Sequence, residues 1–326
     1  MNIRPLPRRR SFNCYSGCVT TVLERSGHIY SEPVAVGLSG ALNLQFTGDG
    51  PIHYRGVREL HCITEFLEAR GLQVRRRVEP DTDAFHTLVV RSLRADLPVM
   101  IEYDGFYYSF TPIYLQQHER RIGLIVGFDE KSYLLTDLVY GVEVVEVPRD
   151  VMLESRTPAR GAAVEPAWYE VDMSNRDVPV PEQVVRSIRA TADYMLESHD
   201  GPALRGSHGA RIFSRQVGDR LQRFRNIDEL TELSQELQQG AILFDHYGEF
   251  LECAAQWSGH SVLEASRAAA LSAGAIAGHL RLVAALILKS TMSDVDRCAA
   301  RISAVVNALA DEADLMFGSL RNLRHG

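Results

Sequence analysis

The chain has 326 residues, of which 45% are hydrophobic and 24% are charged, and its formal net charge is −7 at pH 7. These values are ordinary for a soluble globular protein with one large or two medium domains. The negative balance provides no basic field for nucleic acid or an anionic membrane surface, so we expect neither partner. Five cysteines are an odd number for a disulfide framework, which favours a reducing, cytoplasmic location.

A buried helix is predicted to begin directly after Asn13. Asparagine is a favoured N-cap residue, and behind it cysteines and apolar residues recur at positions 14, 18, 19, 22 and 23, the spacing of one helical face. Cys14 therefore lies in the first turn, where free backbone N–H groups and the positive end of the helix dipole stabilise a thiolate. This placement makes Cys14 a candidate nucleophile.

Two other interpretations of the cysteines stay open. Free cysteines are among the most buried residue types, and Cys18, one turn further into the helix, fits a packing role better than Cys14 does. Cys14 and Cys18 also have the spacing of a metal-binding pair. No second pair of ligands at short spacing completes a tetrahedral site, so we predict no metal.

The first half of the chain is predicted to place helices before an antiparallel sheet. The helix at Cys14 ends near residues 26–27, and a second helix covers residues 56–70. Between them, residues 33–42 are small and apolar, and Gly37 and Gly40 are expected to line the site opposite Cys14 because glycine permits close approach. Strands are predicted at 97–103, 122–128, 132–137 and 142–147, joined by short breaks. This order indicates an α+β domain.

The second half is predicted to be helical. Residues 148–181 are rich in proline, glycine and charge, which is typical of an interdomain connection. Helical patterns follow at 182–197, 210–223, 227–256, 262–272, 274–288 and 292–323. We therefore predict a domain over residues 1–150, a linker over 151–181 and an all-α domain over 182–326, whose long helices also suit a homodimer.

Several short motifs carry a resemblance to a known family. In chain order they are Asn13-Cys14-Tyr15-Ser16-Gly17, Ser31-Glu32-Pro33, Val36-Gly37-Leu38-Ser39-Gly40, Leu97-Pro98-Val99, Val126-Gly127-Phe128-Asp129 and Thr136-Asp137. With these motifs in this order, the first domain resembles the butirosin biosynthesis protein H family. Residues 240–251 resemble a signature of the helical domain that follows it in that family.

The resemblance implies a fold and an activity. The family resembles papain-fold acyltransferases of natural-product biosynthesis, in which a cysteine accepts an acyl group from a thioester and passes it to an amine. The donor would be the phosphopantetheine arm of an acyl or peptidyl carrier protein. The implied partners are thus a carrier protein and a small-molecule amine, and the chain needs no cofactor of its own.

The resemblance also assigns roles to residues of this chain. It places the nucleophile on Cys14 and the orienting acid on Asp137. The family pattern expects a histidine just before the strand that ends in Gly-aromatic-Asp, where this chain has Arg120 and Arg121, with His118 shortly before them. We predict His118 as the general base and Arg121 as a substrate-binding residue, because an arginine can lower a thiol pKa but cannot act as a general acid.

Three functions follow from these residues. The favoured one is an acyltransferase or amide-forming condensation enzyme that works through a cysteine acyl-enzyme. A thioesterase or amidase would hydrolyse the same acyl-enzyme, and only water exclusion and acceptor binding separate the two. The third is a catalytically inactive carrier-binding protein, which Arg121 at the histidine position favours.

Overall fold

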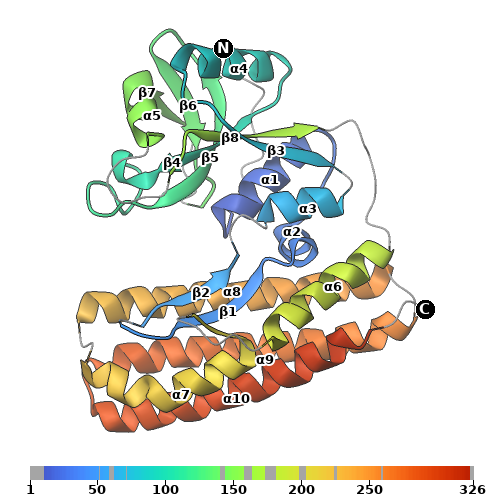
Figure 1. Ribbon diagram of the computed structural model, residues 1–326, viewed down its shortest axis with the longest axis vertical. Coiled ribbons are helices and arrows are strands. Elements are labelled where there is room, and N and C mark those ends of the chain that lie inside the picture. Colours follow the sequence, from blue (N-terminus) through green and yellow to red (C-terminus); the bar gives the residue numbers. More distant parts are fainter. Residues whose placement is uncertain are drawn as a thin grey trace. The chain divides into compact units, whose positions relative to one another are not determined.

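The computed structural model describes residues 11–50, 52–58, 62–70, 72–139, 144–157, 164–172, 181–197, 203–223, 226–257 and 260–323 (Figure 1). The chain divides into two compact units. The first unit comprises Met1–Ala35 and Cys62–Asp177, and the second comprises Val36–His61 and Val178–Gly326. Antiparallel sheets dominate the first half and helices the second, which confirms the predicted α+β class.

The first unit contains a six-stranded sheet in which neighbouring strands are all antiparallel. The strand order is β3 (Gln73–Val78), β8 (Ala167–Asp172), β4 (Val99–Asp104), β5 (Arg120–Phe128), β6 (Ser132–Thr136) and β7 (Val145–Pro148). Every residue of β4 is buried, as are residues 121–127 of β5. The apolar runs that predicted these two strands therefore form the centre of the sheet.

Helices cover the sheet of the first unit. α1 (Cys14–Arg25) packs against β5, α3 (Thr64–Ala69) against β3, and α4 (Thr82–Arg94) against β4 and β5. α5 (Arg149–Ser155) contacts β6 and β7, and a single 3₁₀ turn, η2 (Gly105–Tyr107), follows β4. The contact of α1 with β5 places the predicted nucleophilic helix on the sheet, as a papain-like layout requires.

The second unit combines a helical bundle with a small sheet. Its helices are α6 (Pro181–Leu196), α7 (Gly206–Arg223), α8 (Ile227–Trp257), α9 (His260–Ser290) and α10 (Val295–Arg321), and the last three lie side by side (Figure 1). The sheet has the antiparallel order β2 (Tyr54–Val57), β1 (Leu42–Thr47) and β9 (Ala203–Arg205). The predicted helical half thus contains one short strand, β9.

One helix of the bundle is apolar over a long stretch. Glu264–Ser290 is long and apolar enough to cross a membrane by length and composition alone, although the run at 280–288 contains Arg281. Core helices of soluble proteins also meet these criteria. Within the bundle α9 packs between α8 and α10, and 44% of its most apolar window is buried.

The division of the chain differs from the predicted boundaries. Residues 151–181 include part of α5 and the whole of β8, which pairs with both β3 and β4 inside the sheet. Along β8, Ala167 and Tyr169 are buried, and they alternate with Trp168 and Glu170, which are only partly buried. The proline and charge on either side of this short strand concealed its alternation. Residues 158–163 and 173–180 of the predicted linker lie outside the described residues.

Two further segments differ from the prediction. The helix predicted at 56–70 begins at Thr64, because residues 54–57 form β2; residues 59–61 lie outside the described part. The two helices predicted at 262–272 and 274–288 are one helix, α9. A Cβ at Gly274 would meet no atom within 4 Å, so this glycine is a tolerated interior residue rather than a break.

Candidate active site around Cys14

The helix that carries Cys14 has the N-cap predicted from the sequence. The Asn13 side-chain oxygen accepts hydrogen bonds from the backbone N–H groups of Tyr15 at 2.8 Å and Ser16 at 3.3 Å. Cys14 is the first residue of α1 and is 7% exposed, whereas Cys18 is fully buried. The positive end of the helix dipole therefore acts at Cys14.

A carboxylate fixes the segment that leads into this helix. Glu32, the first residue of α2 (Glu32–Ser39), accepts hydrogen bonds from the Phe12 N–H at 3.1 Å, the Asn13 N–H at 3.4 Å and the Ser16 hydroxyl at 2.7 Å, and also from the Ser11 hydroxyl. Glu32 therefore binds both the residues before Cys14 and the first turn after it. Glu32 thereby positions the turn that carries Cys14.

Gly17 is required where α1 meets this segment. A Cβ at Gly17 would lie 2.1 Å from the Ser11 Oγ, so no larger residue fits without moving the chain. The Ser11 backbone N–H also donates to the Leu138 carbonyl at 2.9 Å. These contacts join the N-terminus of α1 to the segment that follows β6.

Arg121 and Asp137 form a buried ion pair beneath α1. The Arg121 Nε donates to the Asp137 Oδ2 at 2.8 Å, and their side chains are 6% and 0% exposed. The Tyr103 hydroxyl donates to the same oxygen at 2.5 Å, and the Val139 N–H donates to Oδ1 at 2.9 Å. Tyr103 and Arg121 are direct partners across β4 and β5, so strand register brings this group together.

Cys14 interacts electrostatically with this pair. Burial alone lowers the pKa of the Arg121 guanidinium, but the anionic forms of Cys14, Tyr103 and Asp137 outweigh burial, so that pKa lies above its ordinary value. Because attraction between two groups is mutual, Arg121 favours the thiolate form of Cys14. Burial, with the Asp137 charge second, raises the pKa of Tyr103, so its hydroxyl stays protonated and can donate.

Cys18 has the packing role that the sequence favoured. Its Sγ lies 3.7 Å from the Ile122 carbonyl of β5. Burial, together with the nearby charges of Cys14 and Asp137, raises the pKa of the Cys18 thiol well above its usual value. Cys18 is therefore a neutral thiol at neutral pH.

His118 has a different partner from the predicted one. Its Nδ1 lies 2.6 Å from the Asp104 Oδ2, and its ring stacks on Phe106 with centroids 4.2 Å apart. The other Asp104 oxygen accepts from the N–H groups of Phe106 at 3.0 Å and Glu119 at 3.1 Å. Asp104, not Asp137, orients His118, whose side chain is 25% exposed. The predicted Asp137 contact was wrong because Arg121 and Tyr103 already occupy that carboxylate.

Gly37 and Gly40, predicted to line the site, belong to the second unit. A Cβ at Gly37 would lie 2.0 Å from the Phe250 ring of α8, so this glycine permits the packing of α2 in that unit. Gly40 has φ +60°, which glycine adopts without strain. Packing therefore accounts for glycine at position 37, and backbone conformation accounts for it at position 40. Contact of either glycine with a substrate stays a prediction.

The residues of the site fall within a match to a known family. Residues 13–138 match the family model described as butirosin biosynthesis protein H, N-terminal. The match supports the assignment of this stretch to that family. The match contains Cys14, His118, Arg121 and Asp137, and the name of the family points to natural-product biosynthesis. No curated protein matches the chain.

The sequence did not single out Asp104, Tyr103 or Glu32 as members of the site. Asp104 directly follows the predicted strand at 97–103, and its register partner is Arg120 at the start of the next strand. The sequence signal that could have identified Asp104 is its position. It is a carboxylate at the end of one predicted strand, close to the start of the next. Glu32 was part of a family motif, but its bonds to the Cys14 turn depend on the fold.

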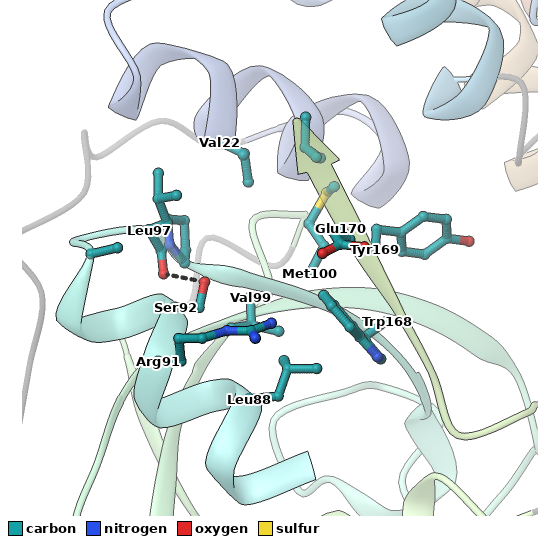
Figure 2. A pocket seen from close by; sticks show the side chains of 13 residues that line it. Val22, Leu88, Arg91, Ser92, Leu97, Val99, Met100, Trp168, Tyr169 and Glu170 are labelled. Atoms are coloured by element: carbon teal, nitrogen blue, oxygen red, sulfur yellow. Dashed lines mark hydrogen bonds between the residues drawn. The ribbon is translucent and has the colours of Figure 1, made fainter. Parts of the chain in front are cut away.

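A separate cavity of about 220 Å³ lies between the end of α4, the start of β4 and β8 (Figure 2). Trp168 and Met100 give it apolar walls, and Arg91 lies at its edge. Val22 of α1 also lines it, about 12 Å further along the helix than Cys14 at 1.5 Å per residue. None of the predicted site residues contributes to this lining, so the cavity is distinct from the Cys14 chemistry.

Proposed function

We propose that the protein is an acyltransferase in which Cys14 accepts an acyl group from a carrier-protein thioester and transfers it to an amine. The observation that supports this proposal is the Arg121–Asp137 pair beside Cys14. Arg121 carries a permanent charge that stabilises a thiolate, and it has no proton to give at neutral pH. The proposal therefore depends on chemistry that needs a stabilised thiolate more than a proton shuttle.

Thioester exchange fits this requirement. The Cys14 sulfur attacks the acyl carbonyl, a new carbon–sulfur bond forms, and the bond to the phosphopantetheine sulfur breaks. The departing thiol has an ordinary pKa of about 8.5, so it leaves as a thiolate without protonation. An amide or alkyl ester donor has a far more basic leaving group, which requires a general acid. Arg121 in place of histidine thus favours thioester donors.

The second step requires removal of a proton. The amine attacks the acyl-enzyme carbonyl, Cys14 leaves as a thiolate, and the nitrogen loses a proton. The His118–Asp104 pair supplies a base oriented by a carboxylate, and His118 is the residue we assign to accept that proton. Exclusion of water would favour the amine over hydrolysis.

A second candidate is a carrier-binding protein without turnover. It is favoured by the same observation, since Asp137 contacts an arginine where a catalytic triad would have a histidine. The two candidates differ in one product. An enzyme forms a covalent acyl-Cys14 intermediate, and a binding protein does not.

Intact-protein mass spectrometry with an acylated carrier protein separates these candidates. The wild-type chain is expected to gain the mass of one acyl group, and Cys14→Ala is expected to gain none. Cys253→Ala is the matched control, because Cys253 is a partly exposed cysteine of α8. Absence of acylation in the wild type, or acylation of Cys14→Ala at the wild-type level, contradicts the proposal.

A further inference from the structure

Three metal-ligating side chains meet in the second unit, away from any role assigned above. They are His53, which directly precedes β2, and Glu232 and Glu236, which lie one turn apart on α8. One ligand atom from each lies within 4.8 Å of the others. Imidazole nitrogen and carboxylate oxygen are both ligands of divalent transition metals.

The spacing of the His53 and Glu236 ligand atoms suits a shared ion better than a hydrogen bond. The His53 Nδ1 and the Glu236 Oε1 are 3.6 Å apart, beyond the usual N–H···O range of about 2.7–3.2 Å. Two ligands about 2.1 Å from a tetrahedral zinc ion are roughly 3.4 Å apart. Glu232 is exposed, so its side chain can rotate to complete the set.

Neighbouring groups hold the turn that carries His53 and orient the Glu236 carboxylate. The His53 backbone N–H donates to the Thr47 Oγ1 at 3.0 Å, and Arg220 of α7 donates to the carbonyls of Thr47 at 2.5 Å and Gly50 at 3.0 Å. The Glu236 Oε2 accepts from the Tyr54 N–H at 2.7 Å. That bond leaves Oε1 directed at His53. Such outer contacts orient the ligands of known metal sites.

The charge of the cluster also favours a cation. Glu232 and Glu236 are like charges at i and i+4 on one helix, an arrangement that is unfavourable in isolation. A bound divalent ion would offset this repulsion. The side chains of His53 and Glu236 are 39% and 25% exposed, so an ion can enter.

We propose that His53, Glu232 and Glu236 form a binding site for a divalent transition-metal ion of the zinc class. The ion would join the turn between β1 and β2 to α8, because His53 comes from the turn and both glutamates come from the helix. Three protein ligands leave a fourth position for water. The site lies within one unit and is independent of the acyl-transfer chemistry at Cys14.

Zinc titration of the full chain, after treatment with a chelator, tests the site. Glu232→Gln removes one ligand charge at an exposed position, so it should leave the fold intact by circular dichroism. Glu249→Gln is the matched control, since Glu249 is also exposed and lies about 25 Å further along α8 than Glu232. The wild type and Glu249→Gln are expected to bind the same number of zinc ions. Glu232→Gln is expected to bind one fewer, or to bind that ion at least tenfold more weakly.

Thermal unfolding provides the second measurement. Zinc should raise the Tm of the wild type and Glu249→Gln, and this rise should be lost in Glu232→Gln and in His53→Asn. Equal zinc stoichiometry and affinity in Glu232→Gln and Glu249→Gln overturns the proposal. So does a zinc-induced Tm rise that both ligand variants retain, because the ions would then bind at the cysteines or at other histidines.

Discussion

Two pairs of a base and a carboxylate lie near the start of β5, and they differ in burial and in chemistry. Arg121 and Asp137 are almost completely buried, and the arginine carries a permanent charge, whereas the His118 side chain is 25% exposed. A conventional triad combines charge stabilisation and proton transfer in one histidine. In the function that we propose, the two tasks belong to separate pairs, and this separation is the reason for proposing a thioester donor.

Among the two pairs, loss of the His118 imidazole is expected to have the largest effect on the reaction rate. His118→Ala should slow transfer from acyl-Cys14 to the amine by about 10²- to 10⁴-fold, the usual contribution of a general base. Formation of acyl-Cys14 from the carrier thioester should be almost unchanged. Single-turnover mass spectrometry measures both steps.

Added imidazole provides the control for the His118 variant. The ring stacks on Phe106, so its removal leaves a space of matching shape, and free imidazole should partly restore transfer. A variant in which acylation and transfer slow together, without rescue, would assign His118 a structural role instead.

Loss of the Arg121–Asp137 ion pair is expected to have the largest effect on stability. Arg121→Gln leaves the Asp137 carboxylate buried without its cation, which should lower the free energy of unfolding by about 3–5 kcal/mol. His118→Gln should lower it by about 1–2 kcal/mol, because Asp104 keeps two backbone N–H donors. Urea denaturation of both variants checks the difference. Equal losses would mean that burial does not distinguish the two pairs.

The sequence predicted the parts of the site that depend on local pattern. The N-cap at Asn13, the helix behind it and the strands β4, β5 and β6 all follow from short-range spacing. β1 was missed although Leu42, Leu44 and Phe46 alternate with polar residues, and β8 was missed because proline and charge surround it. Local strand signals fail where a strand is short or polar.

The parts that the sequence could not predict depend on register between distant residues. Asp104 and His118 meet because β4 and β5 pair with Asp104 opposite Arg120. The same register places Tyr103 opposite Arg121, and Asp137 then takes the arginine rather than the histidine. A shift of one residue would exchange these faces, and periodicity alone does not determine it.

The central claim is that the Arg121 charge stabilises the Cys14 thiolate and so suits the chain to thioesters. The most direct measurement compares the rate of Cys14 acylation by an acyl thioester and by the matching alkyl ester, in the wild type and in Arg121→Gln. We predict that the wild type is acylated by the thioester and not detectably by the ester, and that Arg121→Gln loses at least about tenfold in the thioester rate at neutral pH. Equal acylation of the wild type by both donors, or an unchanged thioester rate in a folded Arg121→Gln variant, would contradict this account.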